Sequence, residues 1–154
     1  MIRDVLLPAL QANFPNRGLR TGQPPDAIAV FPAAHPEVGD VNIYDDGNEA
    51  MVSVGQITHG HFGWTDANRT EAEMANAVTD EVVRFLTDLF ADRIVLWKSS
   101  GGAGGWWLVG HDNSLSIMDA DDFTYLWSGP VPNPLRESAA ERIVGREQPK
   151  NSDK

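Results

Sequence analysis

The segment that most constrains the fold is an apolar stripe of helical period in the middle of the chain. Its apolar residues recur at spacings of three and four: Met74, Val78, Val82, Phe85, Leu86 and Leu89. Thr70, followed three residues later by Glu73, forms a capping-box pattern that marks the start of a helix. The spacing predicts a helix of about 71–91 with one apolar face. Burying that face contributes roughly 10 kcal/mol before entropy is counted, so the helix requires a sheet to pack against.

Alternating apolar and polar residues on both sides of Asp45-Asp46-Gly47-Asn48 predict a β-hairpin. The Asp-Gly pair favours a tight turn, because both residues tolerate a positive φ. We expect the two strands at about 40–45 and 49–58. Five further apolar runs predict strands at 27–31, 94–97, 106–109, 115–118 and 123–127.

The two ends of the chain show the pattern of short helices. Apolar residues at helical spacing follow Ile2, and Asn133 followed by Pro134 is typical of a helix start. Because strands follow one another in blocks, the order of elements favours an α+β fold, with one mainly antiparallel sheet and the long helix on one face. A chain of 154 residues fits a single domain. We expect this domain at 1–147 and a polar, disordered tail at 148–154.

The net charge of −10 comes from one part of the chain. Residues 37–92 hold twelve acidic residues and two basic ones. Such a surface repels phosphate backbones, so we expect no nucleic-acid partner. No run approaches the roughly 18 apolar residues of a membrane span, and no leader is visible, so we expect no membrane partner and a cytoplasmic location. The chain has no cysteine, which excludes disulfides and thiolate sites.

A pair of histidines provides the main candidate for a metal site. His59 and His61 lie two residues apart at the end of a predicted strand, so both side chains point to the same face. Two imidazoles with a third ligand can hold a divalent ion such as zinc. The candidate third ligands are His35, His111, Asp112 and Asp66. The alternative interpretation is that one histidine is a polar surface residue and the other hydrogen-bonds a loop carbonyl.

Motifs for other chemistry are absent from the sequence. The glycine-rich segment 101–105 runs into Trp106 and a predicted strand, whereas a phosphate-binding loop runs into a helix. We therefore expect a hairpin tip there. The chain has no Gly-x-Ser-x-Gly pattern, so a non-enzymatic role is favoured, although the sequence leaves an enzyme open. Neighbouring residues of a strand face opposite sides, so either Trp106 or Trp107 lies under the C-terminal helix or is exposed as a binding hot spot.

These features favour a small, non-enzymatic protein-binding module whose acidic surface binds a basic protein, as an immunity protein, an antitoxin or a regulator would. The candidate partner-binding residues are Trp106, Trp107, Asp45, Asp46 and Glu49. The alternative is a divalent-metal-binding protein or hydrolase built on His59 and His61, with zinc as its candidate ion and no other cofactor. A structural or regulatory homo-oligomer, which associates through the exposed tryptophan and a sheet edge, is the third hypothesis.

Overall fold

The computed structural model describes residues 2–63, 66–111 and 118–135. These residues form two helices, α1 (Ile2–Asn13) and α2 (Glu71–Phe90). They also form nine strands: β1 (Arg20–Thr21), β2 (Ala29–Phe31), β3 (Val41–Asp45), β4 (Glu49–Val54), β5 (Thr58–Gly63), β6 (Ile94–Lys98), β7 (Gly104–Leu108), β8 (Phe123–Leu126) and β9 (Gly129–Val131).

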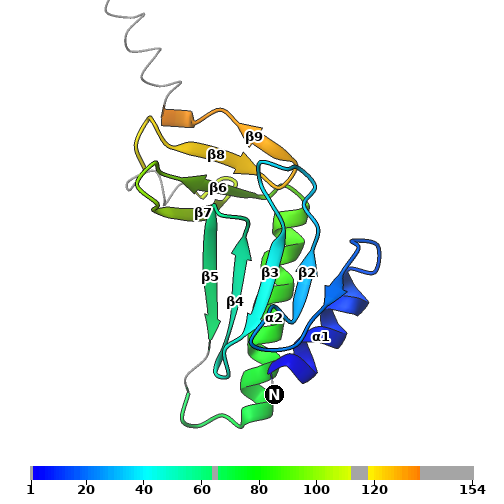
Figure 1. Cartoon of the computed structure of the whole chain (residues 1–154). Coiled ribbons are helices and arrows are strands. Elements are labelled where there is room, and N and C mark those ends of the chain that lie inside the picture. The colour runs from blue at the N-terminus through cyan, green and yellow to red at the C-terminus, as the bar shows by residue number, and fades with distance from the viewer. Residues whose placement is uncertain (1, 64–65, 112–117, 136–154) are drawn as a thin grey trace, which may run out of the picture.

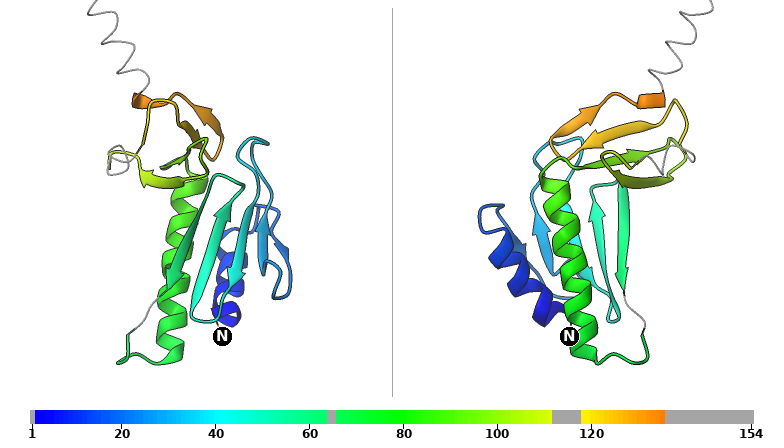
Figure 2. Two further views of the ribbon diagram at one scale, coloured as in Figure 1. Left: turned by 60° about the vertical axis from the view of Figure 1, so that its left-hand side comes forward. Right: turned by 180° about the vertical axis from the view of Figure 1, so that it is seen from behind.

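The strands make two antiparallel sheets, which is the main difference from the expected architecture. One sheet has the order β1-β2-β3-β4-β5 and the other the order β7-β6-β8-β9. Figure 1 shows the four-stranded sheet across the upper end of the five-stranded one. The predicted α+β class is confirmed, whereas the prediction of one sheet is wrong. In Figure 2, α1 and α2 lie on the same face of the five-stranded sheet.

Helix α2 begins at the capping box that the sequence predicts. The backbone N–H of Glu73 donates to the Thr70 hydroxyl at 3.2 Å, and the backbone N–H of Thr70 donates to the Glu73 carboxylate at 2.7 Å. The helix ends at Phe90. It contacts α1, β4 and β5, and also β6 of the second sheet. The long helix therefore joins both sheets, instead of packing on one sheet alone as expected.

The hairpin at Asp45-Asp46-Gly47-Asn48 is confirmed as the connection between β3 and β4, with Gly47 at φ 87°. Its second strand is shorter than predicted, because the chain turns at Gly55 and returns as β5. Gly55 has φ 51°, and a Cβ there would collide with the carbonyl oxygen of Val38. That close approach between distant segments fixes the turn and makes β5 a separate strand.

Other predicted elements differ or lie outside the described residues. Strands β1 and β9 occupy Pro-rich stretches in which no strand is predicted, and β9 contains Pro130. A proline is tolerated there because β9 is an edge strand. The predicted strand at 115–118, apart from Met118, lies outside the described residues, as do the C-terminal helix beyond Leu135 and the tail at 148–154.

One core joins the helices and both sheets. Leu6 of α1, Val52 of β4, Leu86 of α2 and Leu96 of β6 are all fully buried within it. A smaller buried cluster of Trp97, Trp107 and Met118 lies in the second sheet and its adjoining loop. None of the helices in the described residues is long and apolar enough to span a membrane.

Candidate functional site

The face of the five-stranded sheet opposite α1 and α2 is covered by no helix or strand of the described residues (Figure 1). Side chains alternate along each strand, and the buried ones face the helices. The others, apart from Glu49 at the margin, form what we call the uncovered face: Val30, Asn42, Tyr44, Met51, Ser53, His59 and His61. Tyr44 lies opposite Met51 across the β3–β4 pair.

The two histidines lie together on this face, as the sequence predicts from their spacing. Their ring centroids are 5.1 Å apart and the ring planes are nearly perpendicular, at 81°. Nδ1 of His61 lies 2.7 Å from Oε1 of Glu49, whose side chain is 38% exposed. The carboxylate therefore fixes the orientation of the His61 ring.

The candidate third ligands that the structure describes, His35, His111 and Asp66, do not join this pair. Nδ1 of His35 accepts a hydrogen bond from the backbone N–H of Glu37, and Asp66 pairs with Arg69. His111 follows the end of β7, and Asp112 lies outside the described residues. Within the part of the chain that the structure describes, no three His, Cys, Asp or Glu side chains form a group suited to a metal ion.

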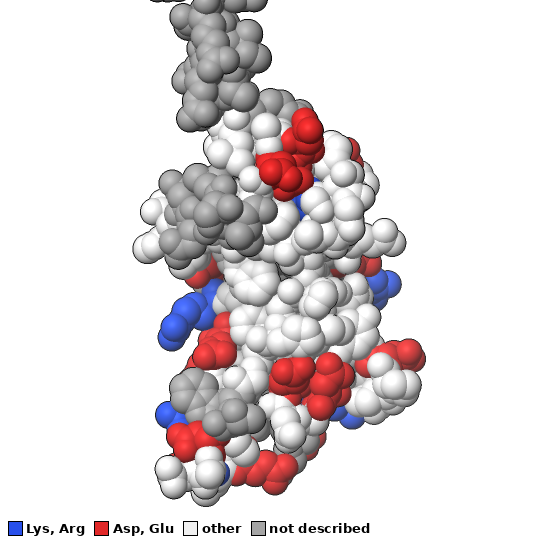
Figure 3. All heavy atoms as spheres, turned by 90° about the vertical axis from the view of Figure 1, so that its left-hand side faces the viewer, with Lys and Arg blue, Asp and Glu red and all other residues white. Residues whose placement is uncertain are grey.

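Acidic residues gather at the end of the sheet where the β3–β4 turn, the end of β5 and the start of α2 meet. This acidic end consists of Asp45, Asp46, Glu49, Asp66, Glu71 and Glu73, which are half of the acidic residues in 37–92. Figure 3 shows several red groups over the lower part of the molecule. The other half lie along α2 or beside its end, and in the loop between β2 and β3, so the acidic surplus is not confined to one flank.

Asp45 has a structural role of which the sequence gives no sign. Its Oδ2 accepts the backbone N–H of Arg3 at 3.0 Å, and its Oδ1 accepts that of Gly47 at 2.9 Å. The carboxylate thus satisfies an open N–H in the first turn of α1 and interacts favourably with the helix dipole. Of the three candidate acidic residues, Asp46 is the one whose whole residue is exposed.

The two candidate tryptophans belong mainly to the interior. Trp107 is 7% exposed and packs in the small cluster with Trp97 and Met118. Trp106 is partly buried, and its ring lies against those of Phe62 and Phe85. Its role is to join β5 and α2 to the second sheet, so these tryptophans do not belong to the uncovered face.

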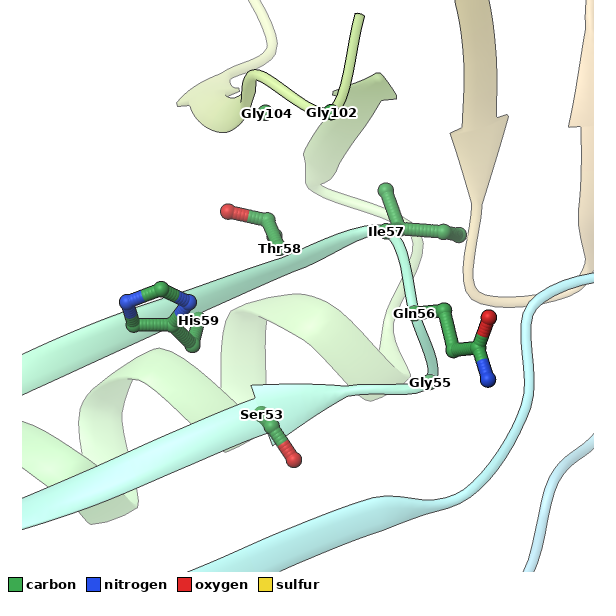
Figure 4. Close-up of a pocket in the computed structure, with 8 residues that line it drawn as sticks. All are labelled: Ser53, Gly55, Gln56, Ile57, Thr58, His59, Gly102 and Gly104. Atoms are coloured by element: carbon green, nitrogen blue, oxygen red, sulfur yellow. The ribbon is translucent and has the colours of Figure 1, made fainter. Parts of the chain in front are cut away.

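A shallow pocket of about 320 Å³ lies between the β4–β5 turn and the glycine-rich segment. It is lined by Ser53, Gly55, Gln56, Ile57, Thr58, His59, Gly102 and Gly104 (Figure 4). In that view Ser53 and Gln56 point away from the glycines. A Cβ on Gly104 would collide with the carbonyl oxygen of Ile57. The glycine at that position therefore permits close packing of the two sheets, and the polar side chains do not converge on a ligand.

Comparisons with protein-family models, curated proteins and solved structures gave no match to this chain. The chemistry of the surface is the remaining guide to function. That surface combines a flat sheet face, with tyrosine, methionine and two histidines, and a margin of carboxylates beside it.

Proposed function

We propose that the chain is a non-enzymatic protein-binding module, and that it binds a basic protein through the uncovered face with the acidic end as its charged margin. The observation that carries this proposal is the composition of the face beside that margin. Tyr44 and Met51 are neighbours on it, and both are partly exposed. Tyrosine and methionine are enriched at the centres of protein interfaces, where charged residues are depleted.

The acidic end supports a partner of opposite charge. Asp46 is exposed at the tip of the β3–β4 turn, and Glu49 lies where that turn enters β4. Carboxylates at the margin of an interface accelerate association with a basic protein and have less effect on the dissociation rate. A second copy of the chain carries the same net charge of −10, which disfavours self-association through this end.

The test is surface plasmon resonance or calorimetry with purified small proteins of pI above about 9, at low and at physiological salt. Three double variants separate the contributions: Tyr44→Ala with Met51→Ala at the centre, Asp46→Asn with Glu49→Gln at the margin, and Asp80→Asn with Glu81→Gln on α2 as the charge-matched control. We expect the margin variant to slow association by about tenfold and the central variant to speed dissociation.

The control variant on α2 should bind as the unmodified protein does. Failure of every basic protein to bind at low salt would overturn the proposal. An equal loss of binding in the α2 variant would also overturn it, because the effect would then come from net charge alone and not from the uncovered face.

A further inference from the structure

We infer that His59 and His61 form a chelating site for one late divalent transition-metal ion, with two imidazoles as its protein ligands and water completing the coordination. The site lies on the uncovered face, but this inference does not rest on the proposed protein partner. It rests on the separation of the two rings, on their exposure and on the carboxylate beside one of them.

The separation of the rings suits a shared metal ion. A metal–nitrogen bond of about 2.0–2.1 Å places the centre of a ligating imidazole about 3.2 Å from the ion, and two such rings at a tetrahedral angle lie about 5.2 Å apart. The observed distance between the centroids of His59 and His61 is 5.1 Å. Both residues are exposed, so an ion reaches them from solvent without any rearrangement of the core.

Glu49 contacts the Nδ1 side of the His61 ring. When Nδ1 of His61 carries the proton and donates it to Oε1 of Glu49, at 2.7 Å, Nε2 keeps its lone pair for a metal. This carboxylate–histidine pairing orients the ring, as in many histidine metal sites. The β4–β5 pairing supports the geometry, because His59 and His61 lie in register opposite Ser53 and Met51 of one strand.

The donor set indicates which ions bind. Imidazole nitrogen suits Cu²⁺, Ni²⁺ and Zn²⁺, and it is a poor ligand for Mg²⁺ and Ca²⁺, which prefer oxygen. Affinity for a nitrogen site rises toward Cu²⁺ and falls again at Zn²⁺. With two protein ligands the ion exchanges readily and keeps open positions, so this is a reversible binding site.

The experiment is calorimetric titration of the untagged full chain with CuCl₂, ZnCl₂ and MgCl₂. We expect one Cu²⁺ per chain, weaker binding of Zn²⁺ and none of Mg²⁺. His59→Ala and His61→Ala should each weaken Cu²⁺ binding by roughly 100-fold, because each leaves one imidazole where two acted together. Glu49→Gln should weaken it about tenfold or more through the orientation of His61.

His111→Ala is the matched control, because His111 is also exposed but lies after β7. It should bind Cu²⁺ as the unmodified chain does, and circular dichroism should show all variants folded. Electron paramagnetic resonance of the Cu²⁺ complex should show coupling to two imidazole nitrogens. Unchanged Cu²⁺ affinity in the variant that lacks both His59 and His61, or loss of affinity in His111→Ala, would overturn the assignment.

Discussion

The indole ring of Trp106 fills the space beside the Cα atom of Gly60, so that a Cβ there would lie 2.6 Å from the ring's Cη2 atom. Gly60 belongs to β5 and Trp106 to β7, so this contact joins the two sheets. The same ring packs against Phe85 of α2, with centroids 5.2 Å apart. A residue without a side chain thus allows an aromatic ring to hold three elements together.

Replacing Gly60 with alanine should destabilise the fold. The added methyl group collides with Trp106 and would lie 3.1 Å from the ring of Phe62, and such overpacking costs about 1–3 kcal/mol. Gly101→Ala is the control, because its nearest neighbour would be 3.7 Å away. Urea denaturation of both variants measures the difference. Equal stability of Gly60→Ala and the unmodified chain would show that the ring moves aside freely.

Thr70→Ala should weaken the start of α2. The hydroxyl of Thr70 accepts the backbone N–H of Glu73, and loss of such an N-cap costs about 1 kcal/mol. Thr70→Ser keeps the acceptor and should retain most of the stability. Thermal unfolding followed by circular dichroism compares the two variants, and an equal loss in both would contradict the capping role.

The carboxylate of Glu73, which accepts the backbone N–H of Thr70, should make the stability of the fold depend on pH. The backbone N–H of Thr70, followed by its hydroxyl, lowers the pKa of Glu73 from the ordinary value of 4.5. Because the folded chain holds the ionised form more strongly than the unfolded chain does, this stabilisation is fully present above pH 4.5 and is lost as the pH falls through the lowered pKa.

The corresponding measurement is the stability difference between the unmodified chain and Glu73→Gln from about pH 7 down to about pH 3. We expect the difference to shrink below pH 4.5, where Glu73 becomes neutral like the glutamine. Glu71→Gln serves as a control for a general change of charge at the same helix end. A difference that stays constant over the whole range would exclude the proposed effect of ionisation.

Replacing Asn133, which follows β9 of the second sheet, should also destabilise the fold. Its side-chain amide donates to the carbonyl oxygens of Asp119 and Asp122, both at 2.9 Å, and its Oδ1 accepts the N–H of Leu135 at 2.8 Å. Asn133 is 4% exposed, so Asn133→Ala leaves buried backbone groups without partners, at a cost of about 1–3 kcal/mol.

Asn133→Asp separates the accepted hydrogen bond from the donated ones, because it keeps the acceptor for the N–H of Leu135 and loses both N–H donors. Chemical denaturation should rank the unmodified chain above both variants. If Asn133→Asp were as stable as the unmodified chain, the bonds to Asp119 and Asp122 would contribute nothing.

The features that the sequence predicts well are those set by neighbouring residues. The start of α2 depends on Thr70 and Glu73, three residues apart, and the β3–β4 turn depends on Asp46-Gly47. The placement of His59 and His61 on one face follows from strand geometry alone. In each case the physical cause lies within a few residues of the feature.

The features that escape prediction depend on contacts between distant segments. The turn at Gly55, which separates β4 from β5, is set by its close approach to Val38. The role of Asp45 at the start of α1 joins residues 42 apart, between Arg3 and Asp45. Likewise, the burial of Trp107 depends on Trp97 and Met118, which no local pattern connects to it.

The shared core has a practical consequence for observing how the molecule unfolds. Four of the five tryptophans, Trp97, Trp106, Trp107 and Trp127, lie in or directly beside the four-stranded sheet, whereas α1 lies on the five-stranded sheet and α2 contacts both sheets. Indole fluorescence therefore reports mainly on the four-stranded sheet, and helical ellipticity reports on α1 and α2. Because Leu96 and Leu86 share one interior, both signals should disappear at the same temperature.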